Sequence, residues 1–136
     1  MKLMMGLCMV GIVLQLFGSP SAANPFLGDW DTPFGVPPFD KIELEHYTPA
    51  FEEGMLRHKQ QIAAIVAEES PPTFANTVEA LERSGEMLDR VASVFFAMKS
   101  SMNNERMEVI AKDVAPKLSQ HGDEILLNEP LFRRIE

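Results

Sequence analysis

The sequence is poor in cysteine, with one residue, Cys8, in a chain of 136. Cys8 lies in an apolar N-terminal run, so residues 24–136 contain no cysteine and a disulfide is excluded there. The stability of this part must come from burial, a metal or a partner. Basic residues are also scarce, because 11 remain against 20 acidic ones when Lys2 is set aside, a net charge of −9. Nucleic acid and anionic membranes are therefore not expected partners, since both require basic patches.

Motifs that carry catalysis are missing as well. The three histidines, His46, His58 and His121, form no His-Glu-x-x-His pattern, which places two zinc ligands one helical turn apart. The nearest approach, "HGDE" from His121 to Glu124, has no second histidine one turn later. There is no glycine-rich phosphate loop and no Gly-x-Ser-x-Gly elbow. We therefore expect no catalytic, cofactor-binding or metal-binding residue in this chain.

Three other groups have both a functional and a structural interpretation. Two pairs of adjacent glutamates could offer carboxylates to a metal, but a solvated helix face explains them better: Glu52-Glu53 and Glu68-Glu69. Three methionines could form a soft-metal or adaptable binding surface, but packing in the core and turns explains them better: Met98, Met102 and Met107. His58 falls on the apolar stripe of a helix, where a histidine usually packs and forms hydrogen bonds.

Residues 1–23 are typical of a secretory signal peptide. Lys2 is followed by an apolar run over residues 3–17 and by a helix-breaking Gly-Ser-Pro. Small residues at Ser21 and Ala23 predict cleavage before Asn24. The apolar run is shorter than the ~20 residues that span a membrane, although an uncleaved anchor is the alternative. We expect an exported, periplasmic protein without stable membrane association after cleavage.

Residues 24–47 are predicted to form an extended strap. Their central stretch, "DTPFGVPPFDKI" from Asp31 to Ile42, has three prolines and no helical or strand periodicity. Proline fixes φ and favours an extended conformation in the residue before it. Four apolar side chains of the strap then need a surface to cover them: Phe34, Val36, Phe39 and Ile42.

Residues 48–136 are predicted to be helical, and the fold class is therefore all-α, with antiparallel amphipathic helices. Thr48 and Pro49 favour the start of one helix, and Thr73 favours the start of a second. The second helix has a long apolar stripe, and Gly85 within it is a position where the helix could be weakened. A third helix is expected from about Glu105, after Asn103 and Asn104. A fourth helix begins after Asn128 with a new apolar stripe. That stripe and the strap need more protein to pack on, so we interpret the chain as a fragment truncated before a further domain.

Four blocks of the sequence together resemble a known family. The blocks are "NPFLGDWDTPFGVPPFDKI" (24–42), "YTPAFEEGM" (47–55), "PTFANTVEALERSGEMLDRVASVFF" (72–96) and "EVIAKDVAPKLSQHGDEILLNEPLF" (108–132). In this order they resemble the N-terminal region of the bacterial peptidyl-dipeptidases (dipeptidyl carboxypeptidases) of the thimet oligopeptidase, or M3, family of zinc metallopeptidases.

The resemblance implies a large helical protein with a deep channel that admits short oligopeptides. It places zinc on a His-Glu-x-x-His helix and a later glutamate in a C-terminal catalytic half, so no site residue carries over to this chain and none is expected to bind zinc here. This region would build one wall of the channel. Two alternatives stay open: a stand-alone periplasmic helical binding module without hydrolytic activity, and the N-terminus of an endo-acting oligopeptidase.

Overall fold

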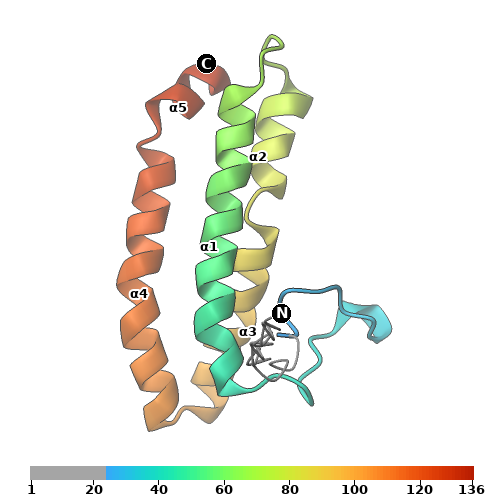
Figure 1. The fold of residues 1–136 in the computed structure, drawn as a ribbon, viewed down its shortest axis with the longest axis vertical. Coiled ribbons are helices and arrows are strands. Elements are labelled where there is room, and N and C mark those ends of the chain that lie inside the picture. Colours follow the sequence, from blue (N-terminus) through green and yellow to red (C-terminus); the bar gives the residue numbers. More distant parts are fainter. Residues whose placement is uncertain (1–23) are drawn as a thin grey trace, which may run out of the picture.

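The fold consists of helices that run along one long axis (Figure 1). The computed structural model describes residues 24–136, and all of the regular structure in this range is helical, which confirms the all-α prediction. In Figure 1, α1 (Leu44–Ala67) stands at the centre with α4 (Glu105–Leu126) on one side. On its other side, α2 (Ala80–Arg83) and α3 (Glu86–Met102) follow one another. The predicted signal peptide, residues 1–23, lies outside the described residues.

The first helix begins earlier than predicted. It starts at Leu44, four residues before the expected cap at Thr48. The Glu43 N–H donates to Nδ1 of His46 at 3.0 Å, which satisfies one of the free N–H groups at the helix start. Pro49 lies inside the helix, which forgoes one backbone hydrogen bond there. The helix start predicted at Thr48 is therefore wrong, because residues 44–47 already belong to the helix.

The second predicted helix begins at its predicted cap, Thr73, and is interrupted at Gly85, where a weak position was predicted. Asn76 N–H donates to Thr73 Oγ1 at 3.1 Å, and Thr73 N–H donates to Asn76 Oδ1 at 2.8 Å. A π-helical segment, Phe74–Glu79, leads into α2. The chain then leaves the helix at Ser84 and Gly85, and Gly85 adopts a left-handed φ of 78° that glycine tolerates without strain.

The caps of the last two helices are also confirmed. Asn104 Oδ1 accepts from Met107 N–H at 3.0 Å at the start of α4. Asn128 Oδ1 accepts from Leu131 N–H at 3.0 Å at the start of α5 (Glu129–Ile135). These side-chain oxygens satisfy backbone donors that a helix start would otherwise leave free. Among residues 24–136, no helix is both long enough and apolar enough to span a membrane.

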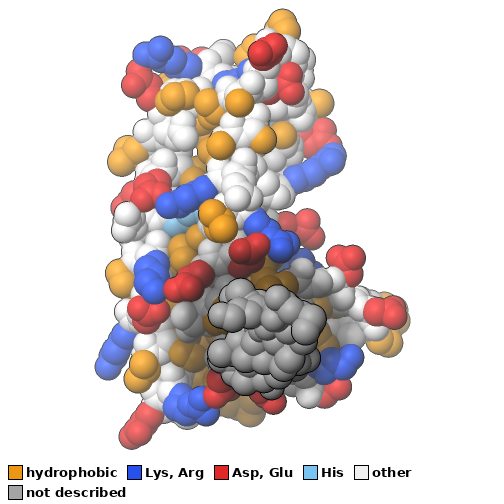
Figure 2. Space-filling model, in the orientation of Figure 1, with side chains coloured by type: hydrophobic (Ala, Val, Ile, Leu, Met, Phe, Trp, Pro, Cys, Tyr) orange, Lys and Arg blue, Asp and Glu red, His pale blue; other side chains and the backbone are white. Residues whose placement is uncertain are grey.

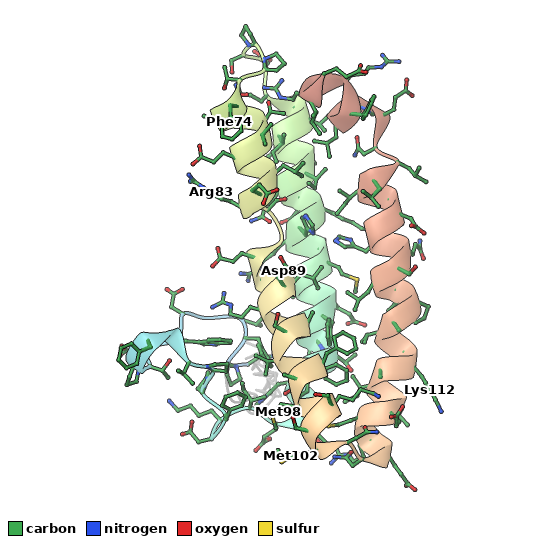
Figure 3. The ribbon with its side chains drawn as sticks, turned by 180° about the vertical axis from the view of Figure 1, so that it is seen from behind. Phe74, Arg83, Asp89, Met98, Met102 and Lys112 are labelled. Carbon is green, nitrogen blue, oxygen red and sulfur yellow. The ribbon has the colours of Figure 1, made fainter. Side chains whose placement is uncertain are left out.

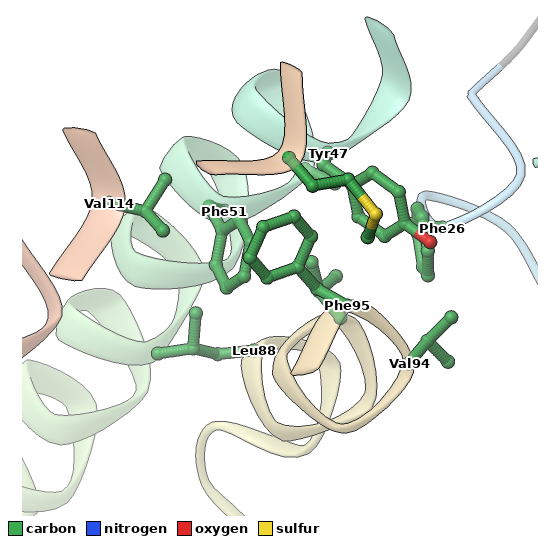
Figure 4. Packing of buried hydrophobic residues seen from close by; sticks show 10 residues of the cluster. Phe26, Tyr47, Phe51, Leu88, Val94, Phe95 and Val114 are labelled. Atoms are coloured by element: carbon green, nitrogen blue, oxygen red, sulfur yellow. The ribbon is translucent and has the colours of Figure 1, made fainter. Parts of the chain in front are cut away.

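The main core is an aromatic cluster at the N-terminal end of α1 (Figure 4). The ring centroid of Tyr47 lies 5.3 Å from that of Phe26 and 4.9 Å from that of Phe95. Phe51 meets Phe95 edge-on at 5.5 Å. All four rings are buried. Such tilted pairs add stabilisation to the burial of apolar surface itself.

A smaller apolar cluster lies toward the other end of α1. Ile62 and Ile65 pack there against Leu131 of α5. Partly buried side chains surround these three: Val66, Ala80, Leu81 and Ile125. The molecule therefore has two separate cores along α1, a larger aromatic one and a smaller aliphatic one.

The segment before α1 differs from the expected strap. Pro33–Gly35 form a single 3-10 turn, with Phe34 at φ 61° and its side chain fully exposed. Val36 and Phe39 are about half exposed, and Ile42 packs on the core. The chain is therefore not extended at this turn, and residues 24–136 do not supply the surface that was expected to cover Phe34. The segment is anchored instead by Phe26, which is fully buried.

Candidate functional site

Two of the three histidines lie against each other in the middle of the helical bundle. His121 Nε2 of α4 is 3.0 Å from His58 Nδ1 of α1, although 63 residues separate them in sequence. Their ring centroids are 5.0 Å apart, at an interplanar angle of 60°. His121 is 4% exposed. His46 lies apart from this pair, at the start of α1.

The hydrogen bonds around the pair favour one arrangement of its protons. Ser84 Oγ donates its only proton to the Leu81 carbonyl at 2.6 Å, so it accepts from His58 Nε2 at 3.1 Å. His58 Nδ1 is then an acceptor, and the proton between the two rings belongs to His121 Nε2. His121 Nδ1 is buried and has no hydrogen-bond partner, as expected for an unprotonated nitrogen. The arrangement with two neutral imidazoles therefore leaves no buried ring N–H without an acceptor.

The pair belongs to a polar layer between the two apolar cores. We define the polar layer as five residues: His58, Gln61, Ser84, Gly85 and His121. Gln61 Oε1 accepts from the Gly85 N–H at 2.9 Å, which satisfies a backbone donor freed by the break between α2 and α3. In Figure 3, the labelled Asp89 lies in the first turn of α3, just after this break. The layer thus joins α1, the break and α4.

Burial determines the charge of the pair. It lowers the pKa of His58, although the nearby Asp89 carboxylate acts in the opposite direction. Burial also lowers the pKa of His121, with further contributions from the neighbouring His58 and Lys59, and Glu124 acts against them. A depressed histidine pKa means that the fold favours the neutral imidazoles.

A cavity of about 320 Å³ lies beside His121, between α1 and α4. An ion pair between Lys59 and Glu124 borders it, and Lys117 Nζ lies 3.5 Å from Glu52 Oε1 across the same two helices. Figure 2 shows a histidine side chain midway along this face, among charged and apolar side chains. A second cavity of about 360 Å³ continues toward α5 along Ile62 and Val66.

The described residues do not fit a zinc ion. No three histidine, cysteine, aspartate or glutamate side chains gather to hold a metal within residues 24–136. The facing nitrogens of His58 and His121 are 3.0 Å apart with a proton between them, whereas zinc needs ~2.0–2.1 Å to each imidazole nitrogen and about four ligands. The histidine pair is therefore a hydrogen-bonded contact rather than a metal centre.

Four of the remaining candidates, Glu53, Glu68, Met98 and Met107, take structural roles of the kind that the sequence favoured. Glu53 pairs with Arg57 at 2.7 Å, and Glu68 accepts from the Ser70 hydroxyl at 2.7 Å. Met107 is buried in the aromatic core and Met98 packs against it. Met102 is 61% exposed, so packing explains only two of the three methionines.

Comparison with known proteins relates the chain to bacterial peptidases. It is 42% identical over 113 residues to the dipeptidyl carboxypeptidase of Escherichia coli K12, which covers 83% of this chain and 17% of that protein. It is 39% identical over 115 residues to the dipeptidyl carboxypeptidase of Salmonella typhimurium, a match that covers 85% of this chain and 17% of that protein. Oligopeptidase A of Escherichia coli is 28% identical over 110 residues, a match that covers 81% of this chain and 16% of that protein. A scan against family profiles gave no match.

The chain matches the N-terminal region of an M3-family peptidase. It spans about 17% of the length of the two dipeptidyl carboxypeptidases. The resemblance stated from the sequence blocks is thereby confirmed.

The contact between His58 and His121 was not predicted from the sequence, although the spacing of His121 gave part of the signal. His121 continues the inward series of α4 from Val114 and Leu118 at helical spacing, and both Val114 and His121 are buried. Whether two histidines on inward faces of different helices contact each other depends on the register between those helices.

Proposed function

We propose that this chain is the N-terminal part of an exported zinc metallopeptidase that releases dipeptides from the C-termini of short peptides. The 42% identity to a dipeptidyl carboxypeptidase carries this proposal. The lower identity of 28% to oligopeptidase A favours dipeptide release over internal cleavage. Short oligopeptides are the corresponding substrates.

In this proposal the described residues build structure and carry no catalysis. The family resemblance assigns the zinc and the general base to a His-Glu-x-x-His helix, and this sequence has no such motif. Bound zinc would activate water for attack on the peptide carbonyl. The chain by itself then neither binds zinc stoichiometrically nor hydrolyses peptides, and its helices form one wall of the substrate channel.

Exposed apolar side chains support the proposal that more protein covers this surface. Leu126 and Leu127, at the end of α4, are 81% and 82% exposed. Phe132 of α5 and Phe74 at the head of the π-helical segment are also exposed. Large apolar patches on a soluble protein generally mark contact surfaces. We assign this end of the bundle to contact with the catalytic half of the peptidase.

Export is part of the same proposal and is tested separately. The apolar run and the small residues Ser21 and Ala23 support cleavage before Asn24. N-terminal sequencing of the protein from a bacterial host should then begin at Asn24. Recovery of Met1 from a membrane fraction would show an uncleaved anchor instead.

Peptidase function is tested by complementation between two separately produced chains. The purified chain is mixed with an Escherichia coli dipeptidyl carboxypeptidase that lacks the matching N-terminal residues, and release of a C-terminal dipeptide is followed. We expect no release from either part alone and chelator-sensitive release from the mixture. Dipeptide release by this chain alone would contradict the structural role, and a folded chain that never associates would favour the stand-alone binding module.

A further inference from the structure

The polar layer lies between the two apolar cores. The aromatic core on one side contains ten buried side chains, whereas the aliphatic core on the other contains three. Between them, the contact between His58 and His121 is a partly buried side-chain hydrogen bond that joins α1 to α4. The smaller core holds the C-terminal ends of α1 and α4 together with far less apolar burial, so this contact matters most for that half of the bundle.

We propose that His58 and His121 form a proton-sensitive latch, which holds the ends of α1 and α4 together while both imidazoles are neutral and releases them when protons bind. The latch concerns only the described residues. It would operate whether or not the chain is part of a peptidase.

The hydrogen-bond chain leaves no acceptor for an additional proton. His58 Nε2 already donates to Ser84 Oγ, so a second proton on His58 would occupy Nδ1. That proton would face the N–H of His121 Nε2 at an N–N distance of 3.0 Å, so the contact could persist only if His121 shifted its own proton to Nδ1. A proton on His121 would occupy Nδ1, which is buried without a partner. Protonation of either ring therefore places an N–H at the buried Nδ1 of His121, which has no acceptor there, and this cost opposes the closed contact.

The surrounding charges do not compensate for a charged pair. Asp89 of α3 favours a charged His58, and Glu124 of α4 favours a charged His121. Glu124 is already engaged by Lys59 and by Gln120, and Lys59 opposes a positive charge on His121. In the cavity beside His121, the carboxylate of Glu52 faces Lys117. The balance of burial and nearby charge thus favours two neutral rings.

The expected movement separates α4 and α5 from the C-terminal half of α1. The cavities of about 320 Å³ and 360 Å³ between these helices mark where the interface is already loosely filled. On the opposite side of the latch, Phe51, Phe95 and Val114 keep the helices joined through the aromatic core. The bundle therefore opens at one end and stays closed at the other.

Distance measurement between two spin labels tests the latch in the full chain. Cys8→Ser removes the only native cysteine, and Gln60→Cys on α1 with Asp123→Cys on α4 place labels at exposed positions. We expect a single short distance at pH 8. A second, longer distance should grow reversibly as the pH falls below 6.5, the ordinary histidine pKa. An unchanged distance distribution between pH 8 and pH 5 would overturn the proposal.

Two histidine variants separate the latch from general acid effects. His121→Phe keeps an aromatic ring in the site but removes both the inter-ring hydrogen bond and one of the two titratable rings, so we expect its distance distribution to change much less than the parent's between pH 8 and pH 5. His46→Gln is the matched control, because His46 contacts neither latch residue, and it should open as the parent does. Equal opening in His121→Phe and the parent would contradict the latch.

Imidazole NMR on the parent chain provides the test should His121→Phe not fold. The side-chain ¹⁵N shifts at pH 7 should show both rings neutral with the proton on Nε2. Both should take up protons over the same pH range in which the longer distance appears. Charging of either ring while the short distance remains would overturn the proposal.

Discussion

Gly85 lies against the ring of His58, so closely that a Cβ on Gly85 would be 2.7 Å from His58 Nδ1. The same nitrogen accepts the hydrogen bond from His121. The left-handed turn between α2 and α3 therefore determines how near α3 lies to the histidine pair. This relationship explains why a residue without a side chain occupies the break.

The first prediction concerns Gly85→Ala. The new methyl group would strain the positive φ and displace His58, and we expect a loss of stability on the order of 2–4 kcal/mol. Urea unfolding followed by circular dichroism measures this loss. Gly28→Ala is the control, because no atom lies within 4 Å of its Cβ position, and it should have little effect. Equal effects of the two substitutions would show that Gly85 is not under steric constraint.

The second prediction compares two helical glycines. A Cβ on Gly54 of α1 would lie 3.1 Å from the backbone Cα of Leu88, whereas nothing lies within 4 Å of one on Gly122 of α4. Gly122→Ala should stabilise the chain by about 0.5–1 kcal/mol, because alanine favours helix. Gly54→Ala should destabilise it by about 1–3 kcal/mol, since α1 and α3 must move apart. Thermal unfolding of the two variants measures the opposite signs, and stabilisation by Gly54→Ala would contradict this packing.

The third prediction concerns the aromatic core. Phe95 is fully buried and meets Tyr47 and Phe51 edge-on, whereas its neighbour Phe96 is 43% exposed. Phe95→Ala should cost about 3–5 kcal/mol, through lost burial and the cavity left behind. Phe96→Ala should cost clearly less in the same denaturation experiment. A larger loss of stability from Phe96→Ala than from Phe95→Ala would contradict the assignment of the core to the face of α3 that contains Phe95.

The fourth prediction concerns Glu108 at the start of α4. Hydrogen bonds from Lys99 and Asn103 hold the pKa of its carboxyl below the usual 4.5. A depressed carboxyl pKa contributes stability above pH 4.5 that disappears as the pH falls through the lower folded value. Carboxyl NMR should therefore show Glu108 titrating below an ordinary glutamate, and Lys99→Met should raise its pKa. Titration at the ordinary value in the parent would contradict these contacts.

Helix existence and several helix starts could be predicted because their signals are local. Thr73, Asn104 and Asn128 cap helices through their own side chains, and Gly85 breaks one through its own φ. The start of α1 was missed because glutamate is a poor cap by preference, whereas Thr48-Pro49 is a strong local signal. Glu43 functions there through its backbone contact with the ring of His46.

The histidine pair and the anchor of the N-terminal segment could not be predicted, because both depend on distant contacts. His58 meets His121 only through the relative register of α1 and α4. Phe26 becomes the anchor because Tyr47 lies beside it in the folded chain, whereas Phe34 is fully exposed and Val36 and Phe39 are about half exposed. Periodicity within one segment can place a side chain on an inward face but does not identify its partner on another helix.

The central claim, that this chain is the N-terminal part of a dipeptide-releasing peptidase, is tested most directly by a chimaera. Residues 24–136 of this chain replace the matching N-terminal residues of the dipeptidyl carboxypeptidase of Escherichia coli, to which the chain is 42% identical. The measurement is release of the C-terminal dipeptide from a short peptide. We predict chelator-sensitive release by the chimaera, as by the parent enzyme. A soluble, folded chimaera that releases no dipeptide while the parent does would contradict the claim.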